Sequence, residues 1–132
     1  MYNPLGLDKN LKLLPELLKT EANYTTDMIG KWHLGHASPG DLPQNRGFDT
    51  FYGFYEAQAD YFTHDLRSRH VYRDQDGPVD KSGRYMTYDL AGKAQEVLKA
   101  TAEQDQPKFI YLPFQAPHLP VIAPDWVKDR IK

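Results

Sequence analysis

Apolar positions along the chain recur first at helical spacing and then at strand spacing. Leucines three and four residues apart predict a helix over about Leu13 to Glu21, with the leucines turned inward. Pro15 fits the first turn of this helix, where its missing N–H is tolerated. The next segment, Tyr24 to Trp32, is rich in Tyr, Thr and Ile and predicts a strand.

The last third of the chain repeats this order. One apolar stripe at a period of 3.6 predicts a helix over about Tyr88 to Glu103, with Thr87 as its N-cap. The mostly apolar run Lys108 to Phe114 predicts a strand buried on both faces, as in a parallel sheet, with Pro113 marking its end. A short helix is expected within residues 124–131. Helix and strand alternating twice indicate an α/β fold with a mostly parallel sheet.

The middle of the chain is aromatic and loop-rich. Residues 36–47 read as loop, and the aromatic run in residues 46–55 predicts a small core under a loop, with a sugar-stacking platform as the alternative. Arg46 and Asp49 lie three residues apart and are expected to pair as a structural clamp. Two short strands are expected at residues 61–64 and 70–73.

Charge and composition narrow the functional classes. The chain has 132 residues, 40% of them hydrophobic and 26% charged, with a formal net charge of −2, so it carries no basic excess for nucleic acid. No apolar run approaches the roughly 20 residues of a membrane span, and no signal peptide is expected. Cysteine is absent, which excludes thiolate chemistry built from this chain. Asn23 begins an N-glycosylation sequon, which matters if the protein is secreted.

A glycine-flanked segment, Gly30 to His36, carries the first candidate chemistry. If residues 29–33 are extended, Lys31 and His33 share one face and Trp32 takes the other. An ammonium beside an imidazole suits a phosphate or sulfate oxygen. The alternative is that Trp32 anchors a strand end and the polar side chains face water.

A second unusual loop follows the last predicted strand. His118 lies between Pro117 and Pro120, which restrict the backbone and would aim the imidazole. Ligands of open parallel sheets bind beyond the carboxyl ends of the strands, so we expect Lys31, His33 and His118 to converge on one rim. The alternative is a stiff turn without function. His64 and His70 are predicted to be surface or hydrogen-bonded structural histidines.

Several segments together resemble the sulfatase family, in particular its arylsulfatase B type (N-acetylgalactosamine-4-sulfatase and relatives). The Gly-Lys-Trp-His-Leu-Gly element is the most specific of them. The matching pieces follow the family's order: Leu14–Lys19, Gly30–Gly35, Asn45–Gly53, Asp60–His64 and Phe109–Pro120.

This resemblance implies a fold, a reaction and residue roles. The fold would be part of an alkaline-phosphatase-like α/β/α sandwich, and the reaction would be hydrolysis of a sulfate ester, such as a sulfated glycan, by a formylglycine nucleophile and a calcium ion. Lys31 would contact the sulfate and the formylglycine, and His33 would hydrogen-bond the formylglycine and help expel sulfate. His118 would contact the sulfate and assist the leaving alcohol. The catalytic candidates are therefore His33 and His118, and all three residues are substrate-binding candidates.

The chain also departs from the family pattern. Neither Cys nor a Ser-x-Pro-x-Arg segment supplies the nucleophile, and the family's calcium ligands and second sulfate-binding lysine have no counterparts. Residues 1–132 are therefore expected to be an internal piece of a sulfatase catalytic domain, inactive alone, with no metal ligands of its own. The parent would be lysosomal or secreted. The alternatives are a non-catalytic binder of sulfated glycans and a phosphodiesterase of the same superfamily.

Overall fold

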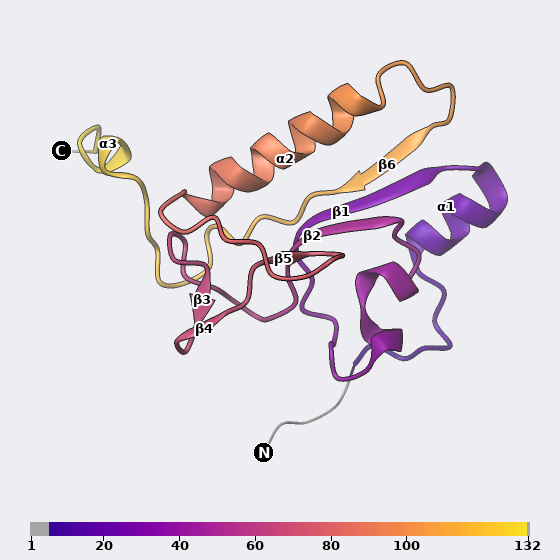
Figure 1. Cartoon of the computed structure of the whole chain (residues 1–132), viewed down its shortest axis with the longest axis horizontal. Helices are drawn as coiled ribbons and strands as arrows, with labels where there is room; N and C mark the ends of the chain where they lie inside the picture. Colours follow the sequence, from indigo (N-terminus) through magenta and orange to yellow (C-terminus); the bar gives the residue numbers. More distant parts are fainter. Residues whose placement is uncertain (1–5, 132) are drawn as a thin grey trace.

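A mixed, mostly parallel sheet forms the centre of the computed structural model, which describes residues 6–131 (Figure 1). The sheet order is β5-β2-β1-β6, and β1 pairs in parallel with both β2 and β6, whereas β5 is antiparallel to β2. Its strands are β1 (Thr25–Lys31), β2 (Thr50–Phe54), β5 (Arg73–Asp74) and β6 (Lys108–Tyr111). The α/β class and the mostly parallel sheet predicted from the sequence are confirmed.

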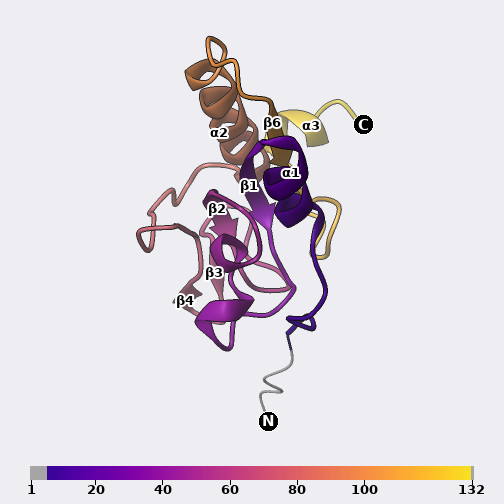
Figure 2. The ribbon, with the colours of Figure 1, turned by 90° about the vertical axis from the view of Figure 1, so that its right-hand side faces the viewer.

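Helices and short elements surround this sheet. A separate two-stranded hairpin precedes β5 in the chain. The helices are α1 (Leu14–Ala22), α2 (Met86–Ala100) and α3 (Asp125–Lys128), the 3-10 turns are η1 (Pro39–Asp41) and η2 (Pro43–Asn45), and the hairpin strands are β3 (Asp65–Leu66) and β4 (Arg69–His70). Figure 2 shows α2 and α1 on opposite sides of β1.

Two cores follow from the alternation of side chains along β1. Ile29 joins a cluster with Leu90 and Ala94 of α2, whereas its neighbour Met28 packs on the other face with Phe48 and other aromatic residues. The aromatic segment is thus buried, as expected. The sequence did not reveal that part of this segment is itself the strand β2.

The leucines of α1 do not all turn inward as predicted. Leu14 is 56% exposed and Leu17 is 39% exposed, whereas Pro15 is buried. Helix α1 rests its first turn against Gly47, where an added Cβ would lie 2.5 Å from the backbone nitrogen of Glu16. This close approach of backbones directs Leu14 and Leu17 away from the described core.

Helix α2 begins one residue before its predicted cap. Tyr85 holds the N-cap position without a side-chain cap bond, so Thr87 lies inside the helix and does not cap it. Asp89 in the first turn is buried and accepts hydrogen bonds from the hydroxyls of Tyr52 at 2.6 Å and Tyr72 at 2.9 Å. Buried tyrosine hydroxyls need acceptors, and tertiary contacts therefore decide the position of this carboxylate.

Strand β6 lies at the sheet edge, so the prediction of burial on both faces is wrong. It ends at Tyr111, two residues before Pro113, and Tyr111 is 44% exposed. A partly buried ion pair between Lys108 and Asp27 of β1, with 2.6 Å between Nζ and Oδ2, fixes β6 beside β1. The two short strands expected at residues 61–64 and 70–73 are replaced by β3, β4 and β5.

Arg46 does act as a clamp, but with different partners. Its guanidinium donates to the carbonyls of Leu7, Asp8 and Leu11 and lies 3.6 Å from Glu16, whereas Asp49 binds Lys19 and Thr26. The predicted Arg46–Asp49 pair is wrong because the guanidinium turns toward the N-terminal segment and donates to three of its carbonyls.

Asn23 ends α1 in a left-handed conformation, with φ of 56°, and this predicts a sharp mutational contrast. Asn23→Val should lower the free energy of unfolding by about 1–2 kcal/mol because a β-branched residue is strained there. Asn23→Gly should be near neutral, since glycine adopts this conformation freely. Urea unfolding of both variants measures the difference, and equal stabilities would contradict the cap assignment.

Candidate functional site

The carboxyl ends of β1 and β6 bring two distant loops to one rim of the sheet. The strands are parallel neighbours, so the residues that follow them emerge on the same side. The Lys31 amide donates to the carbonyl of Pro113 at 3.0 Å, which ties the two loops together. Gly30 permits this approach, since a Cβ there would lie 2.2 Å from the Pro113 oxygen.

Lys31 places an uncompensated cation at this rim. The residue is half-buried, and no carboxylate within residues 6–131 lies within ion-pair distance of its ammonium. A partly desolvated ammonium without a counter-charge is costly, and an anionic ligand would offset that cost. The position therefore favours binding of an anion.

His33 lies just beyond the end of β1. Its φ of 52° takes the backbone out of the extended conformation, so Lys31 and His33 are not related by strand alternation. The His33 amide donates to the carbonyl of Tyr55 at 3.1 Å, which fixes the residue against the end of β2. Burial, followed by the positive charges of Lys31, His118 and His36, lowers the pKa of His33. These charges place His118 within electrostatic range of His33.

His118 is held in a braced loop. Its amide donates to the Gln115 carbonyl at 2.9 Å, and its own carbonyl accepts from the Tyr61 hydroxyl at 2.9 Å. The imidazole Nδ1 lies 2.6 Å from the Leu119 carbonyl. Because a carbonyl only accepts, Nδ1 carries the proton, and Nε2 is the nitrogen left to meet a ligand.

The sequence did not single out Gln115, which positions this loop. Its buried amide exchanges two hydrogen bonds with the backbone of Ala59, at 2.6 Å and 2.7 Å. A glutamine flanked by apolar residues carries no distinctive sequence signal. The structure identifies Gln115 as a positioning residue for His118.

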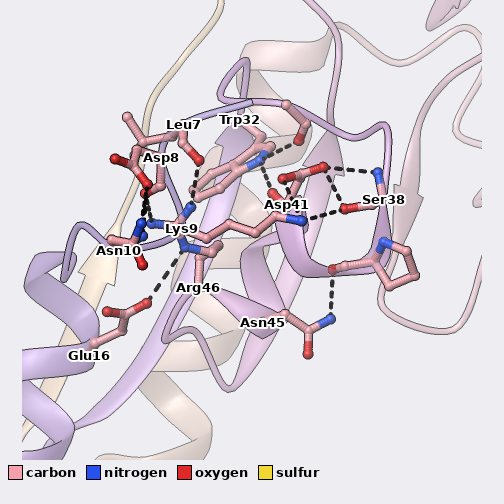
Figure 3. A network of polar contacts seen from close by, with 12 residues as sticks. Leu7, Asp8, Lys9, Asn10, Glu16, Trp32, Ser38, Asp41, Asn45 and Arg46 are labelled. Atoms are coloured by element: carbon pink, nitrogen blue, oxygen red, sulfur yellow. Dashed lines mark hydrogen bonds and ion pairs between the residues drawn. The ribbon is translucent and has the colours of Figure 1, made fainter. Parts of the chain in front are cut away.

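Trp32 anchors the glycine-flanked loop, as the structural interpretation expected. Its indole is 4% exposed, and Nε1 donates to the carbonyls of Gly35 and Asp41, each at 2.9 Å (Figure 3). Asp41 in turn accepts from Ser38 and lies 3.6 Å from Lys9. This network fixes the loop that carries His33 and His36.

The two remaining histidines are structural, as predicted. His64 is buried beneath the hairpin, and its Nε2 lies 3.0 Å from the carbonyl of Arg84. His70 bonds Asp65 at 3.1 Å and the carbonyl of Val79 at 2.9 Å. Neither side chain joins Lys31 at the rim through a described contact.

The described residues do not fit a calcium site. Within residues 6–131, no three His, Asp or Glu side chains gather where they could hold a metal ion. Calcium needs six to eight oxygen ligands, several of them carboxylates. Any calcium ligands would therefore come from outside this part of the chain.

The family model described as Sulfatase matches residues 2–131. Arylsulfatase J of Mus musculus is 37% identical over 129 residues, which cover 92% of this chain and 21% of that protein. N-acetylgalactosamine-6-sulfatase of Canis lupus familiaris is 34% identical over 131 residues, covering 89% of this chain and 23% of that protein.

Solved structures share the fold. Ps i-CgsB in complex with k-i-k-neocarrahexaose superposes with a TM-score of 0.85 at 27% identity, over 98% of this chain and 32% of that chain. The PsFucS1 sulfatase from Pseudoalteromonas sp. gives a TM-score of 0.63 at 19% identity, over 92% and 32% of the two chains. The expected alkaline-phosphatase-like α/β fold is thereby confirmed. The chain spans about a third or less of the length of these proteins, and it belongs to the sulfatase family.

Proposed function

We propose that the chain forms part of a sulfuric ester hydrolase in which Lys31, His33 and His118 surround the sulfate group. The observation that carries this proposal is the half-buried ammonium of Lys31, which has no carboxylate partner in the described structure. The pKa of His33 is lowered mainly by burial and then by the charges of Lys31 and His118. Membership of the sulfatase family supports the same chemistry. An anion at this rim would offset the positive charge of Lys31 and favour the protonated form of His33.

Each residue has a role that follows from its chemistry. Lys31 binds sulfate oxygens and offsets the charge that develops on them, a contact typically worth about 2.7–4 kcal/mol in related sites. His118 meets the bridging oxygen through Nε2 and, as an imidazolium that carries a second proton on Nε2, donates that proton to the leaving alcohol. By family resemblance, His33 would hydrogen-bond the formylglycine that the parent protein supplies and would help expel sulfate.

The parent protein would supply the remaining groups. By family resemblance, these are a formylglycine nucleophile and a calcium ion that adds positive charge at the sulfate. This chain has no cysteine, and its described residues hold no metal-ligand cluster. We therefore interpret residues 1–132 as a partial catalytic domain that lacks the nucleophile and the metal ligands.

The proposed substrate is a sulfated glycan, and the proposed subtype is the arylsulfatase B type. The resemblance of Ps i-CgsB, which was solved with a neocarrahexaose, supports a sugar substrate. The relatives named above include an N-acetylgalactosamine-6-sulfatase, so the family match does not single out the B type.

The parent is proposed to be lysosomal or secreted. Asn23 of the sequon is exposed at the end of α1, where a glycan can be attached. Its backbone and side-chain oxygens accept from Gln106, which leaves the amide nitrogen free for modification. No helix within residues 6–131 has the length and apolar character needed to cross a bilayer.

Binding of an aryl sulfate tests the proposal. The purified chain should bind 4-nitrophenyl sulfate weakly, and Lys31→Met should weaken binding at least tenfold, because it removes a charged hydrogen bond worth about 1.5–3 kcal/mol. Calorimetric titration measures the effect. Lys12→Met, which removes an exposed lysine elsewhere, is the matched control and should leave binding unchanged.

Hydrolysis is not expected from this chain alone, because the nucleophile is missing. Release of nitrophenol above that of a Lys31→Ala variant would contradict the assignment of residues 1–132 as a partial domain. Equal binding by the wild type and Lys31→Met would contradict the sulfate site itself.

A further inference from the structure

A groove lies beside the rim and carries more cations than anions. It has a volume of about 530 Å³ and is bordered by the η1 segment, the end of β2, the β3–β4 hairpin and β5. Three arginines line it, Arg67, Arg69 and Arg73, against the single carboxylate of Glu56. Within residues 6–131, no carboxylate lies within ion-pair distance of these guanidinium groups.

Two lining side chains have buried polar atoms without partners in the described structure. Nε of Arg73 is a donor without an acceptor, and Oε2 of Glu56 is an acceptor without a donor. Buried polar atoms are nearly always hydrogen-bonded, so the side chains of Arg73 and Glu56 gain partners if they turn toward a ligand in the groove. A ligand that pairs with both side chains must both accept and donate hydrogen bonds.

The aromatic ring of Tyr55 forms part of the wall of the groove. The guanidinium of Arg73 lies 4.9 Å from the centroid of the buried Tyr55 ring, which holds the cation in place. His36 stacks against the same Tyr55 ring, with 6.2 Å between centroids.

His36 connects the groove to the proposed sulfate site. It belongs to the loop that follows β1, and its charge contributes to lowering the pKa of His33. In Figures 1 and 2 the parallel strands run toward the side of the molecule where β3 and β4 lie. The rim and the groove therefore share the loop that follows β1 and lie toward the same side of the sheet.

We propose that this groove binds a second anionic group, a sulfate or a carboxylate, on a sugar unit next to the one whose sulfate lies at Lys31. Arg67, Arg69 and Arg73 bind the anion, and Glu56 accepts a hydrogen bond from a sugar hydroxyl. A simple inorganic anion would leave Glu56 unsatisfied, whereas a hydroxylated anionic sugar satisfies both kinds of atom. This inference rests on the proposed function, because the first sulfate sets the position of the second unit.

Binding of defined disaccharides tests the proposal. The probes are a disaccharide with one sulfate, the same disaccharide with a further sulfate on the second unit, and one with a carboxylate there. The wild-type chain should bind both doubly anionic probes about tenfold or more tighter than the singly sulfated one. The Arg67→Gln/Arg69→Gln variant should lose this preference while it binds the singly sulfated probe as the wild type does.

The matched control is Lys12→Gln/Lys99→Gln, which removes two exposed cations elsewhere and should keep the preference. Thermal unfolding checks that all variants fold. If the arginine variant keeps the preference, or if the wild type shows none, the groove proposal is overturned. If Lys31→Met binds the singly sulfated probe as tightly as the wild type, the proposed function fails, whereas loss of the preference in the arginine variant would still support the groove.

Discussion

Asp89→Ala is expected to lower the free energy of unfolding by about 3–5 kcal/mol. Asp89 is 4% exposed, accepts from the hydroxyls of Tyr52 and Tyr72, and lies 3.3 Å from Arg84. The variant leaves two buried hydroxyls without an acceptor, at about 1–3 kcal/mol each, and opens a small void. Urea unfolding measures the loss, and Asp105→Ala, at an exposed site, should be neutral.

A double-mutant cycle separates the hydrogen bonds from the void. In a Tyr52→Phe/Tyr72→Phe background, Asp89→Ala should cost much less, because no hydroxyl is left unsatisfied. An equal cost in both backgrounds would contradict the role assigned to Asp89.

The same carboxylate predicts a dependence of stability on pH. Burial first, and then Asp89, raise the pKa of Tyr52, and the pKa of Tyr72 is raised with burial as the largest cause. The stability that these shifts provide is complete below the unfolded tyrosine pKa of about 10 and is lost as pH rises further. The loss at high pH should be smaller in Tyr72→Phe.

Gly30→Ala is expected to prevent formation of the rim. A Cβ there would lie 2.2 Å from the Pro113 carbonyl oxygen, which accepts the Lys31 amide, and φ is 134°. Removal of this clash requires β1 and the loop after β6 to separate, so we expect a loss of several kcal/mol or no cooperative unfolding at all. Circular dichroism during thermal unfolding provides the measurement.

Gly77→Ala is the matched control for Gly30→Ala. Gly77 also has a positive φ, of 152°, but a Cβ there meets nothing within 4 Å. It therefore reports backbone strain alone, which costs about 1–3 kcal/mol. If both alanine variants lose the same stability, the close approach of the two loops at Gly30 is contradicted.

The sequence reveals those parts of the fold that depend on local patterns. Strand β1 and helices α1 and α2 lie within a few residues of their predicted bounds, because apolar periodicity and breakers define them. Strand β2 was not recognised, since a run of aromatic residues is equally typical of a core under a loop. The partners of Arg46 and Asp89 are distant in sequence, so short-range spacing misleads there.

Sequence patterns likewise predict some features of the candidate site and miss others. The sequence places Lys31, His33 and His118 at or just beyond strand ends, and the parallel pairing of β1 with β6 brings those ends together. The left-handed backbone of His33 and the hydrogen bond between Gln115 and Ala59 depend on tertiary contacts, so no sequence pattern predicts them. Two of the groove arginines, Arg67 and Arg69, come from a hairpin whose strands are only two residues long, too short for periodicity to detect.

A proton NMR titration of the imidazoles, with and without sodium sulfate, tests the convergence of Lys31, His33 and His118 most directly. The free chain should show a His33 pKa below the usual 6.5, because of burial and of the charges of Lys31, His118 and His36. Sulfate at the rim should raise that pKa, since an anion favours the protonated His33 ring, and it should shift the His118 resonances at the same sulfate concentration because it contacts both side chains. Lys31→Met should weaken this response. A His33 response that leaves His118 unaffected would contradict a shared sulfate site.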